Sequence, residues 1–209
     1  MFTGLVEEAG EIVRFAREEE TDRYVLEVHA PRLVEGVAAG DSVAVNGCCL
    51  TATASAAEGR LRFDLLGETV RLTNFGQLSP GRLVNLERSL LPTTRMGGHM
   101  VSGHIDECAA VDLFEPRGAD HYLRVRTSPE ALRYLVPKGC IAVDGISLTV
   151  AEVHADGFAV WLIPHTLEVT HLRDRSAGEW VNLEYDLLAK YVERMLEARA
   201  TTNPAMGPA

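Results

Sequence analysis

The sequence contains an internal repeat with a period of about 98 residues, and this repeat restricts the fold more than any other feature. Residues 43–51 (VAVNGCCLT) align with residues 141–149 (IAVDGISLT), with five of nine positions identical. Three further windows align in the same order at offsets of 97 to 99: residues 1–8 with 100–107, 69–73 with 166–170, and 84–87 with 181–184. The repeat predicts two sister domains, residues 1–97 and 98–186.

Each half consists of short β-branched or alternating runs separated by turn residues, a pattern typical of antiparallel strands. In the first half these runs are residues 11–17, 24–28, 42–45, 61–65 and 83–86. Long amphipathic helices between the runs are absent from the sequence, which disfavours a parallel α/β sheet. We therefore predict an all-β barrel or sandwich in each half, with short helical turns at residues 31–35, 70–76, 128–135 and 167–173.

A single long helix is predicted after the second repeat. Asp186 is suited to cap its first turn, and apolar residues then recur at helical spacing: Leu187, Leu188, Tyr191, Val192, Met195 and Leu196. This helix, residues 187–200, either folds back on a barrel or associates with copies of itself. Residues 201–209 have little to bury, and we expect a disordered tail.

Composition excludes several classes of protein. The chain of 209 residues has a net charge of −10, which gives no electrostatic reason to bind nucleic acid or anionic lipid. We expect neither export nor membrane insertion, since the acidic N-terminus does not resemble a signal peptide and no run of 18 apolar residues occurs. The four cysteines lack zinc-ligand spacing, and we interpret them as reduced thiols in the cytoplasm. Walker, GxGxxG, GxSxG and HExxH motifs are also absent from the sequence.

The densest polar cluster in the sequence is residues 97–106. His99 and His104 suggest a metal site, but on a strand their side chains would point to opposite faces, so we expect no metal. We interpret His99 as a structural, hydrogen-bonded histidine near the domain junction. His104 would share a face with Ser102 and Asp106, and for it a chemical and a structural role remain equally open.

The repeat also pairs candidate pocket residues from the two halves. Cys49 aligns with Ser147, and each is followed by Leu-Thr, so that a polar atom and a threonine share one strand face. Glu68-Thr69 and His165-Thr166 end the later strands, where the threonines either cap helices or contact a ligand. Lys138 is by default a solvated cation beside a turn.

Four motifs together resemble riboflavin synthases of the alpha-chain type, over residues 1 to about 198: MFTGLV (1–6), NGCCLT (46–51), GGHMVSGH (97–104) and DGISLT (144–149). The resemblance implies tandem six-stranded Greek-key β-barrels and a C-terminal helix that assembles a homotrimer. It also implies a reaction in which two 6,7-dimethyl-8-ribityllumazine molecules exchange a four-carbon unit, without a metal or redox cofactor. The products are riboflavin and 5-amino-6-(ribitylamino)uracil.

The resemblance implies one ligand site per barrel. For the first ligand it implies Gly4, Leu5, Val6, Ser42, Cys49, Leu50, Thr51, Asp64, Leu65, Leu66, Gly67, Glu68 and Thr69. For the second it implies Gly103, His104, Ile105, Lys138, Ser147, Leu148, Thr149, Trp161, Leu162, Ile163, Pro164, His165 and Thr166, and Asp186 is a further binding candidate. We expect His104 to shuttle a methyl proton, Ser147 or Cys49 to activate the group that adds to the ring, and Phe2 to pack on a ring.

The same resemblance leaves an alternative function. Non-catalytic lumazine- and flavin-binding antenna proteins of luminous bacteria are similar to the enzyme but keep one working pocket. This sequence retains polar residues in both halves, which favours the enzyme. A flavin-binding reductase is disfavoured because no βαβ nucleotide domain is encoded. The sequence does not indicate whether a lumazine synthase capsid is a further partner.

Overall fold

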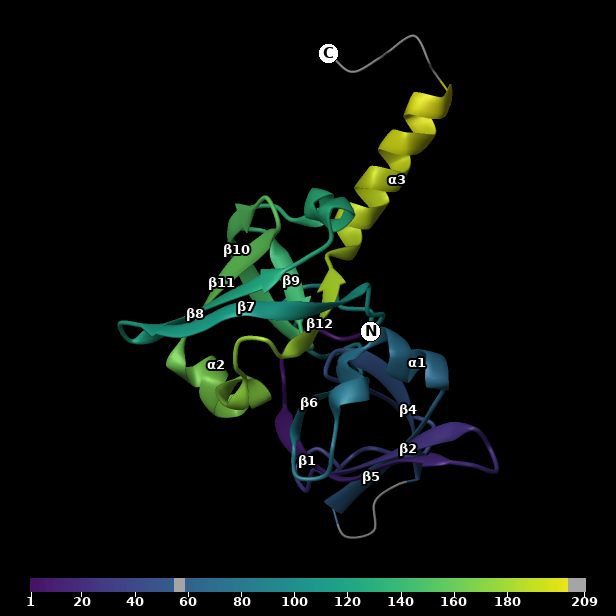
Figure 1. The fold of residues 1–209 in the computed structure, drawn as a ribbon. Helices are drawn as coiled ribbons and strands as arrows, with labels where there is room; N and C mark the ends of the chain where they lie inside the picture. The colour runs from purple at the N-terminus through teal and green to yellow at the C-terminus, as the bar shows by residue number, and fades with distance from the viewer. Residues whose placement is uncertain (55–58, 203–209) are drawn as a thin grey trace.

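The computed structural model describes residues 1–54 and 59–202, which form two β-barrels and a projecting C-terminal helix (Figure 1). Both barrels are closed, antiparallel and six-stranded. The predicted fold class is therefore confirmed. Most of the predicted tail, residues 203–209, lies outside the described part of the chain.

The first barrel contains strands β1 (Glu8–Glu18), β2 (Arg23–His29), β3 (Ser42–Val45), β4 (Cys48–Ala54), β5 (Arg60–Leu65) and β6 (Leu83–Arg88). Their spatial order is β1-β2-β5-β4-β3-β6. Strand β3 therefore lies between β4 and β6, and β2 pairs with β5 rather than with β3. Alternation along β5 places Leu61, Phe63 and Leu65 in the barrel core. All five strands predicted for this half lie within observed strands.

The second barrel repeats this topology with β7 (Glu107–Arg117), β8 (Asp120–Arg126), β9 (Cys140–Val143), β10 (Ile146–His154), β11 (Gly157–Leu162) and β12 (Trp180–Tyr185). Its core is built from the equivalent inward positions, among them Leu123, Val143 and Phe158. The internal sequence repeat thus corresponds to a structural repeat of six strands.

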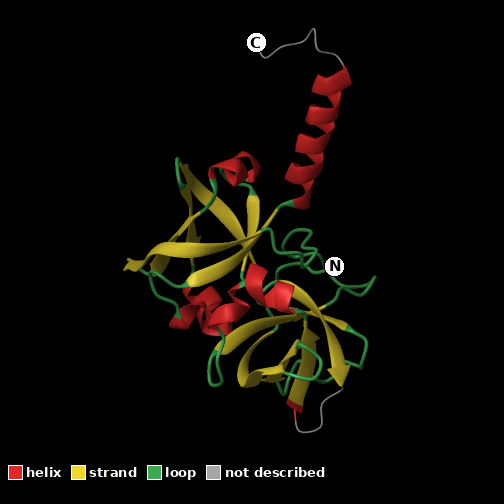
Figure 2. Ribbon diagram, turned by 45° about the vertical axis from the view of Figure 1, so that its right-hand side comes forward, coloured by secondary structure: helices red, strands yellow, loops and turns green. Residues whose placement is uncertain are grey.

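Short helices lie at the junction of the barrels and near the base of the long helix (Figure 2). They are α1 (Gly67–Leu72) with η2 (Asn74–Gln77), η3 (Pro129–Tyr134), and α2 (Pro164–Val169) with η4 (His171–Asp174). At residues 31–35 the predicted helical turn is limited to a single i→i−4 hydrogen bond, from the Val34 N–H to the Ala30 carbonyl at 3.0 Å, within a run of turns. The Glu8 carboxylate accepts the N–H groups of Arg32 and Leu33 at 3.1 and 2.7 Å, which fixes the segment as a loop on the barrel.

Two equivalent turns meet where the barrels touch. Asn46-Gly47 joins β3 to β4, and Asp144-Gly145 joins β9 to β10. All four residues have positive φ, as type I′ hairpin turns require. A Cβ on either glycine would lie 2.7 Å from the backbone nitrogen of the other glycine. Only glycine therefore allows the two hairpins to approach so closely.

A buried charged cluster crosses this junction. The Asp144 carboxylate is fully buried, and its Oδ2 lies 3.1 Å from His171 Nε2 and 3.3 Å from Arg175 Nη2. Its Oδ1 accepts hydrogen bonds from Asn74 Nδ2 and from the Asn182 backbone, both at 2.8 Å. Because Asn74 belongs to the first half of the chain, this cluster links the two barrels.

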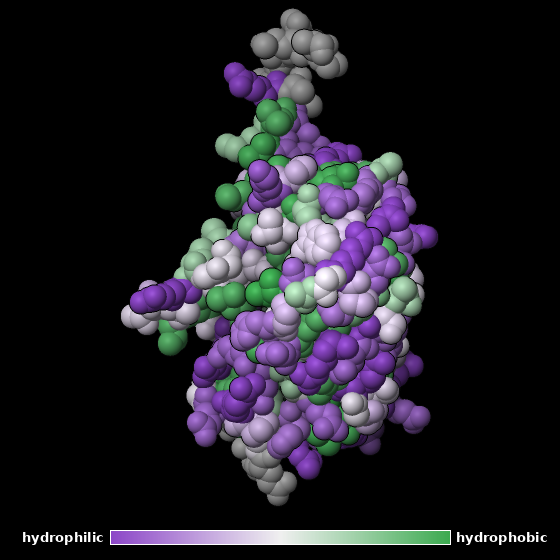
Figure 3. Space-filling view, turned by 90° about the vertical axis from the view of Figure 1, so that its left-hand side faces the viewer, coloured by the Kyte–Doolittle hydropathy of each residue, from purple (hydrophilic) through white to green (hydrophobic). Residues whose placement is uncertain are grey.

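The long helix α3 (Leu187–Thr202) projects from the second barrel and extends two residues beyond its predicted end. Asp186 Oδ1 accepts the Leu188 N–H at 2.9 Å, so the predicted N-terminal cap is confirmed. Hydrophobic side chains lie exposed along the helix (Figure 3), namely Leu188, Tyr191, Val192, Met195 and Leu196. No helix among the described residues has the length and apolar character needed to cross a bilayer.

Candidate functional site

Two irregular segments, residues 1–7 and 98–106, cross between the barrels. They pair with each other at Phe2 and Val101, through backbone hydrogen bonds of 2.7 and 3.1 Å. The Gly4 carbonyl accepts the Ser147 N–H of the second barrel at 2.8 Å, and the Gly103 carbonyl accepts the Cys49 N–H of the first, also at 2.8 Å. Gly4 and Gly103 therefore each contribute to the lip of the opposite barrel.

This crossing reverses part of the expected grouping of site residues. Gly4 lies with Ser147, and Val6 packs on the core of the second barrel. Gly103 lies with Cys49, while Ile105 packs on the core of the first. The reversal arises because each segment precedes the first strand of its own barrel yet docks on the fourth strand of the other, a crossing that the repeat does not reveal.

The second barrel carries a hydrogen-bonded serine–histidine pair. His99 Nδ1 lies 2.7 Å from Ser147 Oγ, and the His99 side chain is buried. Burial lowers the pKa of His99 below its ordinary value, and the negative charges of Asp186 and Glu184 partly oppose that effect. The imidazole is therefore neutral near pH 7, and a neutral imidazole can accept the serine proton.

The first barrel presents Cys49 at the position equivalent to Ser147. Cys49 is partly exposed and packs against Phe2, Ala44 and Val101, where the crossing segments meet. Its neighbour Cys48 points into the barrel core, and burial raises the pKa of that thiol to about 12. Of the two adjacent cysteines, Cys49 is thus the one placed at the pocket lip.

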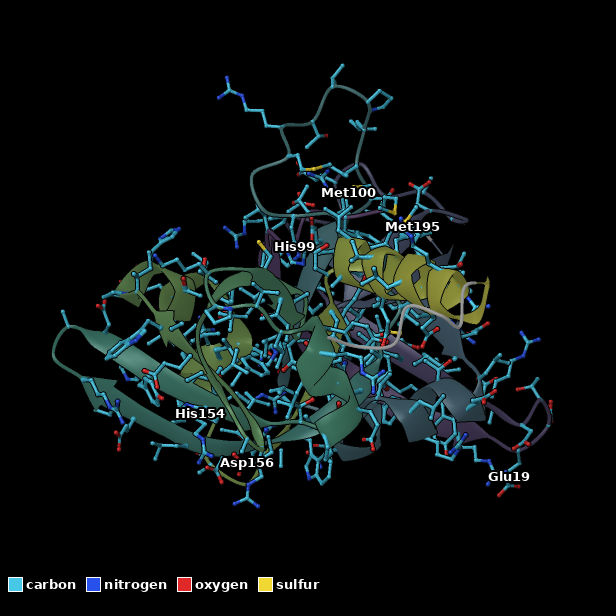
Figure 4. All side chains as sticks on the ribbon, turned by 90° about the horizontal axis from the view of Figure 1, so that it is seen from above. Glu19, His99, Met100, His154, Asp156 and Met195 are labelled. Atoms are coloured by element: carbon cyan, nitrogen blue, oxygen red, sulfur yellow. The ribbon has the colours of Figure 1, made fainter. Side chains whose placement is uncertain are left out.

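A cavity of about 440 Å³ opens beside the mouth of the first barrel, within the size range of small-molecule pockets. Ser42 and Glu87 line it from the barrel, and Leu5 lines it from the first crossing segment. Leu91 and Arg95 line it from the inter-barrel linker, which projects from the body of the molecule near Met100 and His99 (Figure 4). Ser42 also pairs with Thr51 across β3 and β4, so both of these predicted site residues lie at this end of the barrel.

His104 does not have the surroundings predicted for it. Residues 98–106 form no strand beyond the single bridge at Val101, so the expected face shared by Ser102, His104 and Asp106 is wrong. Asp106 instead bonds Lys190 at 2.7 Å and the Tyr185 N–H at 2.8 Å. His104 is exposed beside Gly103, at the lip of the first barrel. Positive φ at Gly103 and its contact with Cys49 break the strand geometry.

Several other predicted site residues are buried. Phe2 is fully buried among Ala44, Val101 and Ala142, so the predicted packing of Phe2 on a bound ring is not available in this structure. Four leucines that the family resemblance implied as ligand contacts lie in the barrel cores: Leu50, Leu65, Leu148 and Leu162. They can shape the base of a pocket but have little surface to offer a ligand.

The two strand ends predicted to contact ligands leave large apolar side chains exposed. Leu66 and Ile163 are 60% and 56% exposed, directly before α1 and α2. The residues that follow them are exposed or half-buried at the helix starts: Gly67, Glu68, Thr69, Pro164, His165 and Thr166. The capping role considered for Thr69 and Thr166 is wrong. The caps are Thr73 and Thr170, whose hydroxyls accept the Phe75 and Leu172 N–H groups.

Trp161 lies on the outer face of β11, opposite the inward-facing Leu162. It makes an edge contact with Tyr122 at 5.2 Å between centroids, and the Arg117 guanidinium lies 3.8 Å from the centre of the Tyr122 ring. The equivalent position in the first barrel is Asp64, which lies 3.3 Å from Arg62. The two barrels therefore differ sharply at this strand end.

Lys138 adopts a left-handed backbone conformation in the turn before β9, and its N–H donates to the Val150 carbonyl at 2.7 Å. Its side chain is exposed, near the end of the β9–β10 pair where Thr149 opposes Cys140. Within residues 1–54 and 59–202, no group of three or more His, Cys, Asp or Glu side chains could hold a metal ion.

The sequence interpretation missed the partner of His99. A buried, hydrogen-bonded histidine was predicted and is confirmed, but its bond to Ser147 joins two motifs separated by 48 residues. One signal was present in the sequence. Gly97-Gly98 precedes His99, and a Cβ on Gly98 would lie 2.9 Å from the Ser147 Cβ, so this glycine allows the close approach.

Comparison with known proteins agrees with the repeat. The lumazine binding domain family matches twice, at residues 3–89 and 102–186. Riboflavin synthase from Actinobacillus pleuropneumoniae is 39% identical, covering 98% of this chain and 94% of that protein. Riboflavin synthase from Mycobacterium tuberculosis (strain ATCC 25618 / H37Rv) is 42% identical, covering 95% and 99%.

A solved structure supports the fold as well. The crystal structure of LumP complexed with riboflavin superimposes with a TM-score of 0.81 at 24% identity, covering 88% of this chain and 99% of that chain. This similarity concerns the fold, whereas the family follows from the two matches of the family model and from the curated relatives. The chain belongs to the riboflavin synthase family and contains two lumazine binding domains.

Proposed function

We propose that this protein is a riboflavin synthase, a transferase that converts two 6,7-dimethyl-8-ribityllumazine molecules into riboflavin and 5-amino-6-(ribitylamino)uracil. One lumazine gives up a four-carbon unit and the other accepts it. The observation that carries this proposal is the identity with riboflavin synthases of about 40% across nearly the whole chain, in both barrels.

The two barrels suit a reaction between identical molecules in different roles. Duplication supplies two similar pockets, and divergence makes them unequal. One lip carries Ser147 with His99, and the other carries Cys49 beside Gly103 and His104. Holding two rings face to face can contribute about 7–11 kcal/mol to catalysis.

The Ser147–His99 pair supports a role in activating a nucleophile. Neutral His99 accepts the Ser147 hydroxyl proton, so that the serine oxygen adds to an electrophilic ring carbon or activates a water that does so. His104 is suitably placed at the opposite lip to exchange a methyl proton. The lumazines themselves supply the carbon acid, so the protein's task is positioning and proton transfer.

The proposed assembly is a cytoplasmic homotrimer held together by α3. Its exposed apolar residues favour burial against copies of the same helix. We further propose that residues 1–97 and 98–186 are the two functional domains. A complete site would then combine the first barrel of one chain with the second barrel of its neighbour, and the trimer would suit enclosure by a lumazine synthase capsid.

The direct test is to incubate the purified protein with the lumazine and to follow riboflavin by its absorbance. The proposal predicts one riboflavin for every two lumazines consumed. Binding of the lumazine without turnover would overturn the proposal and would favour the antenna function. Substrate-free protein and a Ser147→Ala variant are the matched controls.

A further inference from the structure

Two buried glutamates occupy equivalent positions in the last strand of each barrel. Glu87 in β6 pairs with Ala44, and Glu184 in β12 pairs with Ala142. Their side chains are 6% and 2% exposed. Neither carboxylate has an ion-pair partner within 4.0 Å among the described residues, so other groups must compensate their burial.

Backbone N–H groups of the crossing segments supply that compensation. Glu87 accepts the Thr3 N–H and hydroxyl, each at 2.7 Å, and the Gly4 N–H at 3.0 Å. Glu184 accepts the Ser102 N–H and hydroxyl at 2.6 and 2.7 Å. It also accepts the Gly103 N–H at 2.9 Å. We call each set of three hydrogen bonds a carboxylate clasp.

The clasps connect opposite barrels. Glu184 belongs to the second barrel, but it holds Gly103, whose carbonyl accepts the Cys49 N–H of the first barrel. Glu87 belongs to the first barrel, but it holds Gly4, whose carbonyl accepts the Ser147 N–H of the second. His104 directly follows the clasped Gly103, so its placement depends on the clasp.

We propose that Glu184 and Glu87 are positioning residues, each of which fixes the pocket lip of the barrel to which it does not belong. Outside the clasps, the crossing segments are tied by the Phe2–Val101 bridge and by further backbone hydrogen bonds, such as that from His99 N–H to the Thr3 carbonyl. The last residue of each segment is also held by an ion pair, Glu7 with Arg88 and Asp106 with Lys190. Hydrogen bonds to a carboxylate are stronger than neutral ones, so each clasp restrains its glycine, Gly4 or Gly103, more strongly than backbone hydrogen bonds alone would. The inference rests on the proposed function only in treating these lips as substrate sites.

Glu184→Gln tests the crossed connection, because it keeps the side-chain volume but turns one acceptor oxygen into a donor. Amide hydrogen exchange, resolved by NMR, should then be about tenfold faster at Cys49 and unchanged within about twofold at Ser147. Glu87→Gln is the matched control and should give the opposite pattern. Equal acceleration at both amides, or acceleration at Ser147 alone in the Glu184 variant, would overturn the proposal.

Ser102→Ala is a milder second variant, since it removes the hydroxyl bond of one clasp and the 3.3 Å bond from the His104 N–H to the same hydroxyl, and it should shift the Cys49 amide in the same direction. If Glu184→Gln does not fold, this variant decides the question alone, and an unchanged Cys49 amide overturns the proposal. The exchange experiment is independent of turnover. Failure of the unmodified protein to form riboflavin would overturn the proposed function. Absence of the expected exchange pattern would overturn the positioning role of the two glutamates.

Discussion

Gly98 shows how strictly a single residue can be specified at the site. A Cβ at this position would lie 2.0 Å from the Thr3 carbonyl oxygen and 3.0 Å from Ser147 Oγ. Both neighbours are fixed, one by the crossing segment and the other by β10, so neither can move away cheaply. The absence of a side chain at residue 98 therefore allows His99 to reach Ser147.

Gly98→Ala should destabilise the protein by about 3 kcal/mol, because the added methyl overlaps backbone atoms. Urea denaturation at fixed protein concentration measures the effect. Gly76→Ala is the control, since its Cβ would meet only the Val70 carbonyl at an ordinary 3.6 Å. A change at residue 98 no larger than at residue 76 would contradict the packing described here.

The lowered pKa of His99 gives a signed prediction for pH dependence. Its pKa in the folded chain lies below the ordinary 6.5, so the imidazole remains neutral at pH 6.5 and becomes protonated only at lower pH. We expect kcat to be level above pH 6.5 and to fall as the pH drops through the folded pKa, together with the stability that His99 contributes.

His99→Ala should lower kcat about a hundredfold and remove this acidic limb from the pH profile. Steady-state rates from pH 5 to 8 measure both effects. His104→Gln provides the comparison, and it should leave the His99 limb in place. Retention of the limb in the His99 variant would show that another group titrates.

The sequence indicated which residues lie at the site better than it indicated what those residues contact. The sequence identified Ser147 and Cys49 as equivalents, because the repeat aligns them directly. It could not pair Ser147 with His99, since that contact depends on segments crossing between barrels. Nor could it show that Phe2 is buried, because an aromatic near a chain end carries no local signal for its environment.

Among the secondary-structure elements, strands and the long helix were predictable and the crossing segments were not. Period-two alternation and Asn-Gly or Asp-Gly turns locate the strands, and period 3.6 locates α3. Residues 98–106 resemble a strand locally, yet positive φ at Gly103 and the clasp at Ser102 prevent ladder pairing. Their conformation is determined by tertiary contacts rather than by local propensity.

The exposed apolar side chains of α3 give a prediction at this scale. Val192→Glu should weaken the proposed trimer strongly, because a carboxylate would have to be buried between helices. Sedimentation velocity should show a shift toward monomer, and riboflavin formation should fall in parallel. Arg194→Glu is the matched control, since the Arg194 side chain is 83% exposed. An unchanged sedimentation coefficient for the Val192 variant would contradict assembly through α3.

At the scale of the whole molecule, the barrel junction is symmetric in its backbone and asymmetric in its charge. The Asn74 N–H donates to Asn182 Oδ1 at 2.7 Å, and the equivalent His171 N–H donates to Asn85 Oδ1 at 2.8 Å. The second half, however, carries Asp144 and Arg175 where the first half carries Asn46 and Leu78. The repeat predicts the two barrels, but only the structure shows that their divergence places a buried ion pair between them.

Arg175→Leu should destabilise the protein by about 3 kcal/mol, because it leaves the buried Asp144 carboxylate without its guanidinium. The double variant Asp144→Asn, Arg175→Leu reproduces the first-half residues and should recover most of this loss. Thermal unfolding of the single and double variants completes the cycle. Additive losses in the double variant would show that the two side chains act independently.

The most direct test of the central claim is an equilibrium titration with a lumazine analogue that cannot donate its carbon unit, counting bound molecules for each chain. Two unequal pockets predict two bound molecules per chain with distinct affinities, and Ser147→Ala should weaken one of them selectively. A single bound molecule per chain, or two indistinguishable ones unaffected by that substitution, would contradict the account.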